Sequence, residues 1–163
     1  MASLGLWEGL AQARPQPGAA SPAEGTEEVE TPICRLRLDR GNGNLVGLSW
    51  KEPALELIQE ARLGENFRLL LPRPGYEANY FVSSEQKVSR IEKSGEGVTC
   101  VYEGLRNARE TVPVKVRYQM RAVGKQLEFG IEVENPTELP LAEVFFGIVG
   151  GQQGLGNRQD TES

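Results

Sequence analysis

The feature that most constrains this chain is an alternation of apolar and polar residues over residues 112–134. The apolar positions are Val112, Val114, Val116, Tyr118 and Met120 in a first run, and Leu127, Phe129, Ile131 and Val133 in a second. A period of two places successive side chains on opposite faces, so each run predicts a half-buried strand. Residues 122–125 between them are of hairpin length, and Gly124 accepts a positive φ. The pattern predicts an antiparallel hairpin at the centre of a β domain.

The chemistry of the side chains suggests how the two strands align. If the numbers of paired residues sum to 247, Tyr118 meets Phe129 and Lys115 meets Glu132. Apolar residues then meet apolar residues, and a basic outer face meets an acidic one. A slip by one residue would destroy both matches. We therefore interpret the acidic residues at positions 128–134 as a solvated charged face.

Shorter runs extend the β pattern on both sides of this hairpin. Cys34, Leu36 and Leu38 alternate with charged residues, a turn follows at 39–44, and residues 45–50 return as a second strand. Further strands are expected at 55–59, 66–71, 79–83, 87–93, 98–103 and 141–149, the last buried on both faces because it is apolar. The 19 Gly and 10 Pro favour many turns. The sequence predicts an all-β fold, an antiparallel β-sandwich over residues 33–163.

Residues 1–32 differ from the rest in composition. After Leu10 they hold few large apolar residues and are rich in Pro, Ala, Gly and Glu, which predicts a disordered leader or linker. The segment Ala11-Gln12-Ala13 is typical of a signal cleavage site, although a basic start and a long apolar core are missing. Two interpretations stay open: a broken signal, which implies a secreted or periplasmic protein, and plain disorder.

Charge and cysteine content exclude several kinds of function. Residues 1–32 carry −4 of the net charge of −5, so the body lacks the basic surface of a nucleic-acid-binding protein. No apolar run reaches the ~18 residues of a membrane-spanning helix.

Because the chain has no His, Cys34 and Cys100 cannot complete a usual zinc site, and no Ser-His or Cys-His pair exists. We expect no metal and no cofactor. The cysteines form one disulfide or are two buried apolar residues.

The densest group of polar and aromatic residues lies between positions 60 and 80. Sugar sites need fixed hydrogen-bonding groups for hydroxyls and an aromatic face for the ring, and this segment has both. The candidate carbohydrate-binding residues are Glu65, Asn66, Arg68, Tyr76, Asn79 and Tyr80. The alternative is that the charged residues form ion pairs at strand ends while the tyrosines pack. Trp50 poses the same choice between a stacking platform and a core residue.

Glu60 and Glu65 are the candidates for acid–base chemistry in the same segment. Glycoside hydrolysis needs two carboxylates about 5 to 9 Å apart, one on each side of the bond. The two residues are close in sequence, but spacing across a loop does not fix their distance.

Four segments resemble galactose-mutarotase-like supersandwich domains of bacterial carbohydrate-active proteins. The opening hairpin of such domains is similar to residues 38–48, LDRGNGNLVGL, and a block in bacterial members is similar to residues 60–72, EARLGENFRLLLP. Later parts resemble residues 133–137, VENPT, and 143–151, EVFFGIVGG. The resemblance covers residues 33–162 and implies a fold that also forms N-terminal domains of large glycosidases and polysaccharide lyases. Mutarotases use histidines, which this chain lacks, so the resemblance implies no catalytic residue.

Three functions remain open on these grounds. The first is a non-catalytic module that binds an oligosaccharide or polysaccharide as part of a larger glycoside-processing protein. The second is a glycosidase or lyase fragment acting through Glu60 or Glu65, and the third is a structural or protein-interaction domain without a sugar site. Because domains of this family are usually longer, we expect the strand at 141–149 to lack part of its partner sheet. The chain should then be marginally stable and self-associate through residues 141–149.

Overall fold

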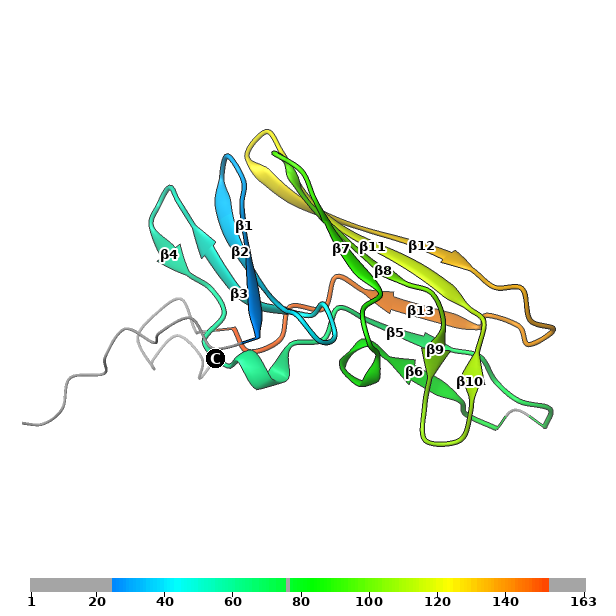
Figure 1. Cartoon of the computed structure of the whole chain (residues 1–163). Coiled ribbons are helices and arrows are strands. Elements are labelled where there is room, and N and C mark those ends of the chain that lie inside the picture. The colour runs from blue at the N-terminus through cyan, green and yellow to red at the C-terminus, as the bar shows by residue number, and fades with distance from the viewer. Residues whose placement is uncertain (1–24, 76, 153–163) are drawn as a thin grey trace, which may run out of the picture.

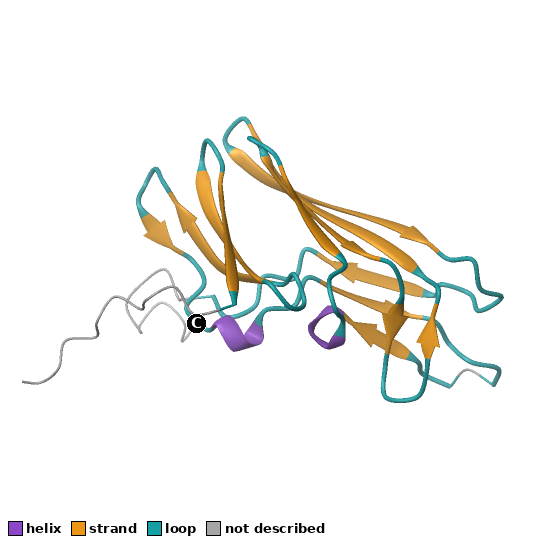
Figure 2. Cartoon of the chain, in the orientation of Figure 1, coloured by secondary structure: helices purple, strands orange, loops and turns teal. Residues whose placement is uncertain are grey.

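The computed structural model describes residues 25–75 and 77–152. Over these residues the chain is built from strands and loops, with two single-turn 3-10 helices, η1 (Ala61–Leu63) and η2 (Ser83–Glu85) (Figure 2). Every ladder between the described strands is antiparallel. The predicted all-β, antiparallel sandwich-like fold is therefore confirmed.

The first sheet lies at the left of Figure 1 and has the order β1-β2-β3-β4. Its strands are β1 (Thr26–Glu30), β2 (Cys34–Asp39), β3 (Leu45–Trp50) and β4 (Leu55–Glu56). The β2–β3 hairpin is the one predicted from the alternation after residue 33. Asp39 shapes its turn, because Oδ1 accepts hydrogen bonds from the backbone N–H groups of Gly41 (2.8 Å) and Asn42 (2.9 Å).

Strand β1 lies inside the segment that composition predicted to be disordered. It pairs with β2 along its whole length. Only Val29 is deeply buried, at 3% exposure, and the other residues are Thr and Glu. Disorder is predicted from low apolar content. A strand with a single buried apolar residue therefore looks disordered by composition. The prediction is wrong for residues 26–30, and the folded part extends at least to Thr26.

The second sheet has the order β12-β11-β8-β7. Its strands are β7 (Arg90–Lys93), β8 (Gly97–Tyr102), β11 (Lys115–Val123) and β12 (Gln126–Glu134). The predicted hairpin is present, but its register is wrong by two residues, since Tyr118 pairs with Ile131 rather than Phe129. Ala122 and Val123 continue the strand, which leaves a two-residue turn. A shift of two keeps each side chain on its face, so apolar matching could not detect it.

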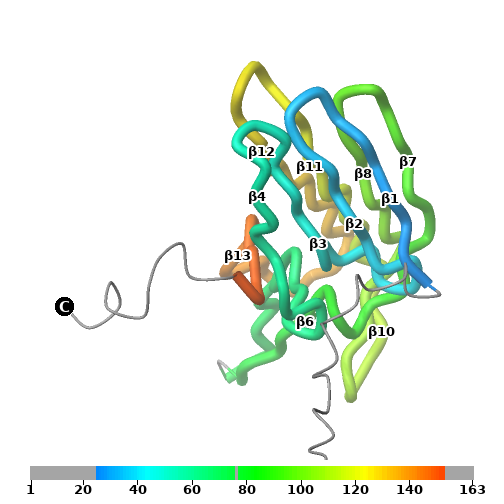
Figure 3. The backbone as a smooth tube through the Cα atoms, turned by 90° about the vertical axis from the view of Figure 1, so that its left-hand side faces the viewer, coloured from blue at the N-terminus to red at the C-terminus, as the bar shows by residue number. Residues whose placement is uncertain are grey.

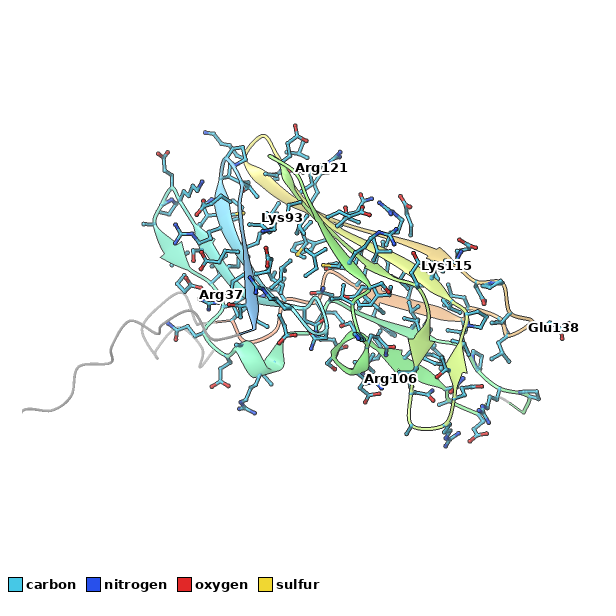
Figure 4. The ribbon with its side chains drawn as sticks, in the orientation of Figure 1. Arg37, Lys93, Arg106, Lys115, Arg121 and Glu138 are labelled. Carbon is cyan, nitrogen blue, oxygen red and sulfur yellow. The ribbon has the colours of Figure 1, made fainter. Side chains whose placement is uncertain are left out.

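The outer face of this hairpin carries the charge ladder that the sequence predicted. The nitrogens of Lys115, Arg117 and Arg121 lie 3.3, 3.9 and 3.7 Å from carboxylate oxygens of β12. Figure 4 shows Lys115 and Arg121 well apart along the hairpin. All these side chains are exposed, and exposed ion pairs contribute at most about 1 kcal/mol. The interpretation as a solvated charged face is confirmed.

Two smaller sheets complete the described part. The three-stranded sheet, in the order β13-β5-β6, contains β5 (Phe67–Leu70), β6 (Tyr80–Val82) and β13 (Glu143–Phe146). The two-stranded sheet pairs β9 (Leu105–Arg106) with β10 (Thr111–Val112). The alternation had placed Val112 in the central hairpin. It pairs with Leu105 instead, and Pro113, which has no N–H to donate, separates it from β11.

One hydrophobic cluster joins these sheets. It includes Leu36 and Leu38 of β2, Phe67 of β5, and Tyr102 and Tyr118 of the second sheet. The rings of Phe67 and Tyr102 meet edge to face, with centroids 5.1 Å apart. Such an arrangement stabilises aromatic pairs beyond their burial.

Both cysteines lie in this cluster as free thiols. The Cys34 thiol forms a hydrogen bond with the Thr31 hydroxyl (3.3 Å), and Cys100 Sγ lies 3.4 Å from the carbonyl oxygen of Gly43. Burial raises the pKa of the Cys100 thiol to about 12 and also raises the pKa of Cys34. Of the two sequence-based alternatives, the structure shows two buried apolar residues and not a disulfide.

Candidate functional site

The six residues predicted to bind carbohydrate fall into three groups in the structure. Glu65, Arg68 and Tyr80 reach the surface. Asn66 and Asn79 are buried, with exposed fractions of 0% and 2%. Tyr76 lies outside the described residues. Of the five that the structure describes, only the first group is therefore placed to touch a ligand at the surface.

Asn66 is fully used in holding the backbone together. Its Nδ2 donates to the carbonyl oxygen of Gly43 (2.8 Å), and its Oδ1 accepts from the N–H of Leu45 (2.9 Å). Its own N–H donates to Ser83 Oγ (2.8 Å). These bonds link the start of β5 to the β2–β3 turn and to η2, which is a structural role.

Asn79 has a comparable role beside the small β9–β10 sheet. Its Nδ2 donates to Glu110 Oε1 (2.9 Å), and its Oδ1 accepts from Asn107 Nδ2 (2.7 Å). Arg73 also reaches Glu110, with 2.9 Å between Nη2 and Oε1. Arg73 and Asn79 together lower the pKa of Glu110. The network fixes the loop between β9 and β10 against the entry to β6.

The sheet of β13, β5 and β6 has one buried side and one exposed side. Residues directly opposite one another on antiparallel strands share a side. Arg68 stands opposite Phe145 and Val82, and Leu70 stands opposite Glu143 and Tyr80. We call these six residues the outward face: Arg68, Leu70, Tyr80, Val82, Glu143 and Phe145. On the other side, Phe67, Leu69 and Phe81 of β5 and β6 are 0% exposed and point into the core, whereas Val144 and Phe146 of β13 share that side but are exposed.

Arg68 lies in the middle of the outward face, directly opposite Phe145 on β13 and diagonal to Tyr80 on β6. Its Nε and Nη2 each lie 3.1 Å from a different carboxylate oxygen of Glu65, which makes a bidentate pair. Phe145 on β13 is 49% exposed, and Tyr80 on β6 is 41% exposed. A guanidinium fork is a directional donor, a carboxylate is an acceptor, and an exposed ring offers an apolar surface. These are the groups that recognition of a polyol ring requires.

An open groove of about 520 Å³ runs along β13 beside this face. It is lined by Leu63, Glu65, Arg68, Val144, Phe145, Phe146 and Ile148. A volume of ~300–1,000 Å³ is typical of small-ligand sites. The groove thus brings Glu65 and Arg68 together with two phenylalanines that the sequence analysis did not select.

The burial predicted for residues 141–149 is wrong. Val144, Phe145 and Phe146 are 38%, 49% and 47% exposed, because β13 ends its sheet within the described part of the chain. Figure 3 shows β13 and β7 on opposite sides of the molecule. An apolar run predicts burial only where another layer or strand covers it, and local sequence does not reveal that cover.

The two candidate catalytic carboxylates are not equally placed. Glu65 lines the groove, whereas Glu60 is not among the lining residues. Glu60 pairs with Arg62, with 2.8 Å between Oε2 and Nε. Hydrolysis by paired carboxylates needs both on one bound sugar. The groove supplies one carboxylate, and that one is already held by Arg68.

Fold and site together define an all-β protein with a solvent-facing sheet surface of aromatic and charged residues. In comparisons with known proteins, neither a family model nor a curated sequence matched the chain. Within residues 25–75 and 77–152 there is no group of three or more potential metal ligands. The same residues contain no helix long and apolar enough to cross a membrane.

Proposed function

We propose that this protein is a non-catalytic, carbohydrate-associated β-sandwich module of a larger glycoside-processing protein. The resemblance of residues 33–162 to supersandwich domains gives the class of function. The observation that carries the proposal is the position of Phe145 directly opposite Arg68 on the outward face. Arg68 in turn holds Glu65 through two hydrogen bonds.

The chemistry of binding follows from these three side chains. The apolar face of a sugar ring packs on Phe145, while the Arg68 guanidinium donates to one hydroxyl and Glu65 accepts from another. Tyr80 lies on the same face, two strands over and two residues along from Phe145, which ordinary strand dimensions convert to roughly 12 Å. An extended saccharide lying across the strands would therefore meet a second ring. This geometry favours an oligosaccharide or polysaccharide over a single sugar.

Calorimetric titration of the purified protein with a panel of oligosaccharides tests this proposal. We expect binding by the wild-type protein and about a tenfold loss in Phe145→Ala and Arg68→Ala, because each removes roughly 1.4 kcal/mol or more of contact. Val123→Ala is the matched control, since Val123 is also an exposed apolar residue (41%) but lies in the second sheet. Absence of binding to every saccharide at millimolar concentration would remove the proposal.

A protein-interaction domain without a sugar site is the second candidate. The exposure of three consecutive apolar residues on β13 favours it, because exposed apolar patches and open sheet edges mark interaction surfaces. Self-association through residues 141–149 belongs to this candidate.

The glycosidase or lyase alternative now depends on Glu65 alone. Turnover by this chain that survives in Glu65→Gln would exclude that role.

A further inference from the structure

The exposed large apolar side chains are concentrated at one place on the described surface. They are Leu63, Tyr80, Val123, Val144, Phe145 and Phe146. Four of these six line the groove along β13: Leu63, Val144, Phe145 and Phe146. A contiguous patch of this kind is unusual on a monomeric protein, whereas single exposed apolar residues are common. The groove is therefore the strongest candidate for a surface that another molecule covers.

The backbone at this groove is an open sheet edge. β13 pairs with β5 on one side and is the last strand of its sheet within residues 25–75 and 77–152. An end strand presents backbone donors and acceptors that an added strand can use. A partner in extended conformation would gain backbone hydrogen bonds and apolar cover together.

Strand β12 is also an end strand, and it shows how this chain prevents such pairing elsewhere. If two copies of β12 met about a two-fold axis at Gly130, Glu128 would stand opposite Glu132 of the second copy. Like charges directly opposite destabilise a strand pair. The acidic outer row of β12 thus disfavours self-pairing at that edge.

Strand β13 lacks this protection. About a two-fold axis at Phe145, that residue would stand opposite itself, Val144 opposite Phe146, and Glu143 opposite Gly147. Every large apolar side chain then meets an apolar one, and the single acidic residue meets a glycine. Moving the axis to Val144 would place Glu143 of each copy opposite Phe145 of the other, which pairs a charged side chain with an apolar one at two positions. The sequence of the strand is self-complementary in one register.

We propose that β13 pairs antiparallel with β13 of a second copy of this chain, with Phe145 on the two-fold axis. The result is one continuous six-stranded sheet in the order β6-β5-β13-β13-β5-β6. Val144 and Phe146 are covered on the core side of this sheet, and the two Phe145 rings meet on the outward face. The partner is thus a second copy held by backbone pairing and apolar contact.

This inference rests on the protein-interaction candidate above, for which it names the partner, and it does not depend on carbohydrate binding. The two proposals share Phe145, but Arg68 stands one strand away from the joined edges and Val144 points to the other side. Arg68→Ala should therefore weaken only sugar binding, whereas the state of association is measured without any sugar. Either proposal can fail while the other holds.

Sedimentation equilibrium of the full chain is the first test. We expect a concentration-dependent dimer for the wild-type protein and at least about a tenfold weaker dimer for Phe145→Glu, because two carboxylates would stand opposite each other. Phe145 is 49% exposed, so the substitution should leave the monomer folded, which circular dichroism verifies. Val123→Glu is the matched control and should dimerise like the wild type. A wild-type protein that stays monomeric at high micromolar concentration overturns the proposal.

Disulfide trapping tests the register itself. Directly opposite Cα atoms in an antiparallel pair lie about 4.5–5.5 Å apart, which a disulfide can span. Phe145→Cys should therefore form a covalent dimer under mild oxidation. In the proposed register the two copies of residue 143 are offset by four residues, about 13 Å, so Glu143→Cys should not. The native Cys34 and Cys100 are buried and serve as background. Equal trapping of both variants would refute this register.

Discussion

Asn44 and Asn66 are both buried, and the side-chain oxygen of each lies within hydrogen-bond distance of a backbone N–H at or next to the other residue. The N–H of Asn66 lies 3.4 Å from Asn44 Oδ1, while Asn66 Oδ1 accepts from the N–H of Leu45, the residue after Asn44, at 2.9 Å. Asn44 Nδ2 also donates to the carbonyl oxygen of Gly64 (2.8 Å). The pair ties the start of β3 to the start of β5. Because β5 carries Arg68, this buried pair also positions the outward face.

Replacing Asn66 with alanine should destabilise the protein by about 2–4 kcal/mol. The change leaves the N–H of Leu45 and the carbonyl oxygen of Gly43 buried without that partner, and each unsatisfied group costs roughly 1–3 kcal/mol. Urea unfolding measures the loss. The exposed Gln126→Ala on the hairpin is the control and should change stability by no more than about 0.5 kcal/mol. A loss below about 1 kcal/mol for Asn66→Ala would contradict the structural role.

The strands that sequence predicted best are those with one buried and one exposed face. In β2 and β11 the apolar residues, such as Leu36 and Tyr118, alternate with charged ones, and the structure buries the former. The pairing partner was harder to predict. The register with Tyr118 opposite Ile131 and the predicted one with Phe129 place the same residues on the same faces. Side-chain type alone cannot separate two registers that differ by two residues.

The candidate site was predicted only in part, because residue type does not reveal what surrounds a side chain. Asn66 was selected for its hydrogen-bonding groups, yet its amide is satisfied by backbone more than 20 positions away in sequence. Phe145 was not selected for the sugar site, because its apolar strand was expected to be buried or to be covered by self-association. Its exposure depends on which strands flank β13, and that is decided by long-range pairing. Glu65 and Arg68 were predictable because their ion pair is local in sequence.

Alkaline pH should destabilise the protein through its buried acidic groups. Burial raises the pKa of Cys100 from 9.0 to about 12 and also raises the pKa of Tyr102. The unfolded chain releases these protons first, so the contribution of these groups to stability is constant below about pH 9 and is lost as pH rises towards 12. Each such group contributes at most about 1.4 kcal/mol per pH unit in that window. Urea unfolding of Cys100→Ala should show a shallower fall than the wild type, and an equal slope would refute the assignment.

Removing the hydroxyl of Tyr102 should cost about 1 kcal/mol at neutral pH. This hydroxyl donates to the carbonyl oxygen of Asn42 at 2.7 Å inside the β2–β3 turn, and a typical hydrogen bond contributes roughly that amount. Tyr102→Phe keeps the edge-to-face contact with Phe67, so the loss measures the hydrogen bond alone. Thermal unfolding gives the value. A variant as stable as the wild type at pH 7 would show that the bond does not hold the turn.

Gly97 should tolerate no side chain, although it begins a regular strand. It stands opposite Arg121 in the ladder between β8 and β11. A Cβ atom there would overlap the carbonyl oxygen of Met120 and lie 2.9 Å from the Cα of Arg121, and both are backbone atoms of the paired strand. Gly97→Ala therefore forces the central strands apart, and we expect a loss of about 3 kcal/mol from overpacking.

Gly95, in the turn just before β8, provides the matched control for this substitution. A Cβ atom at Gly95 would have no atom within 4 Å, so Gly95→Ala should change stability by less than about 1 kcal/mol in either direction. Both variants remove a glycine from the unfolded chain, and only one collides with the β11 backbone in the folded state. The difference between their urea midpoints therefore measures the collision. Equal midpoints would mean that β8 and β11 are not packed as closely as the ladder requires.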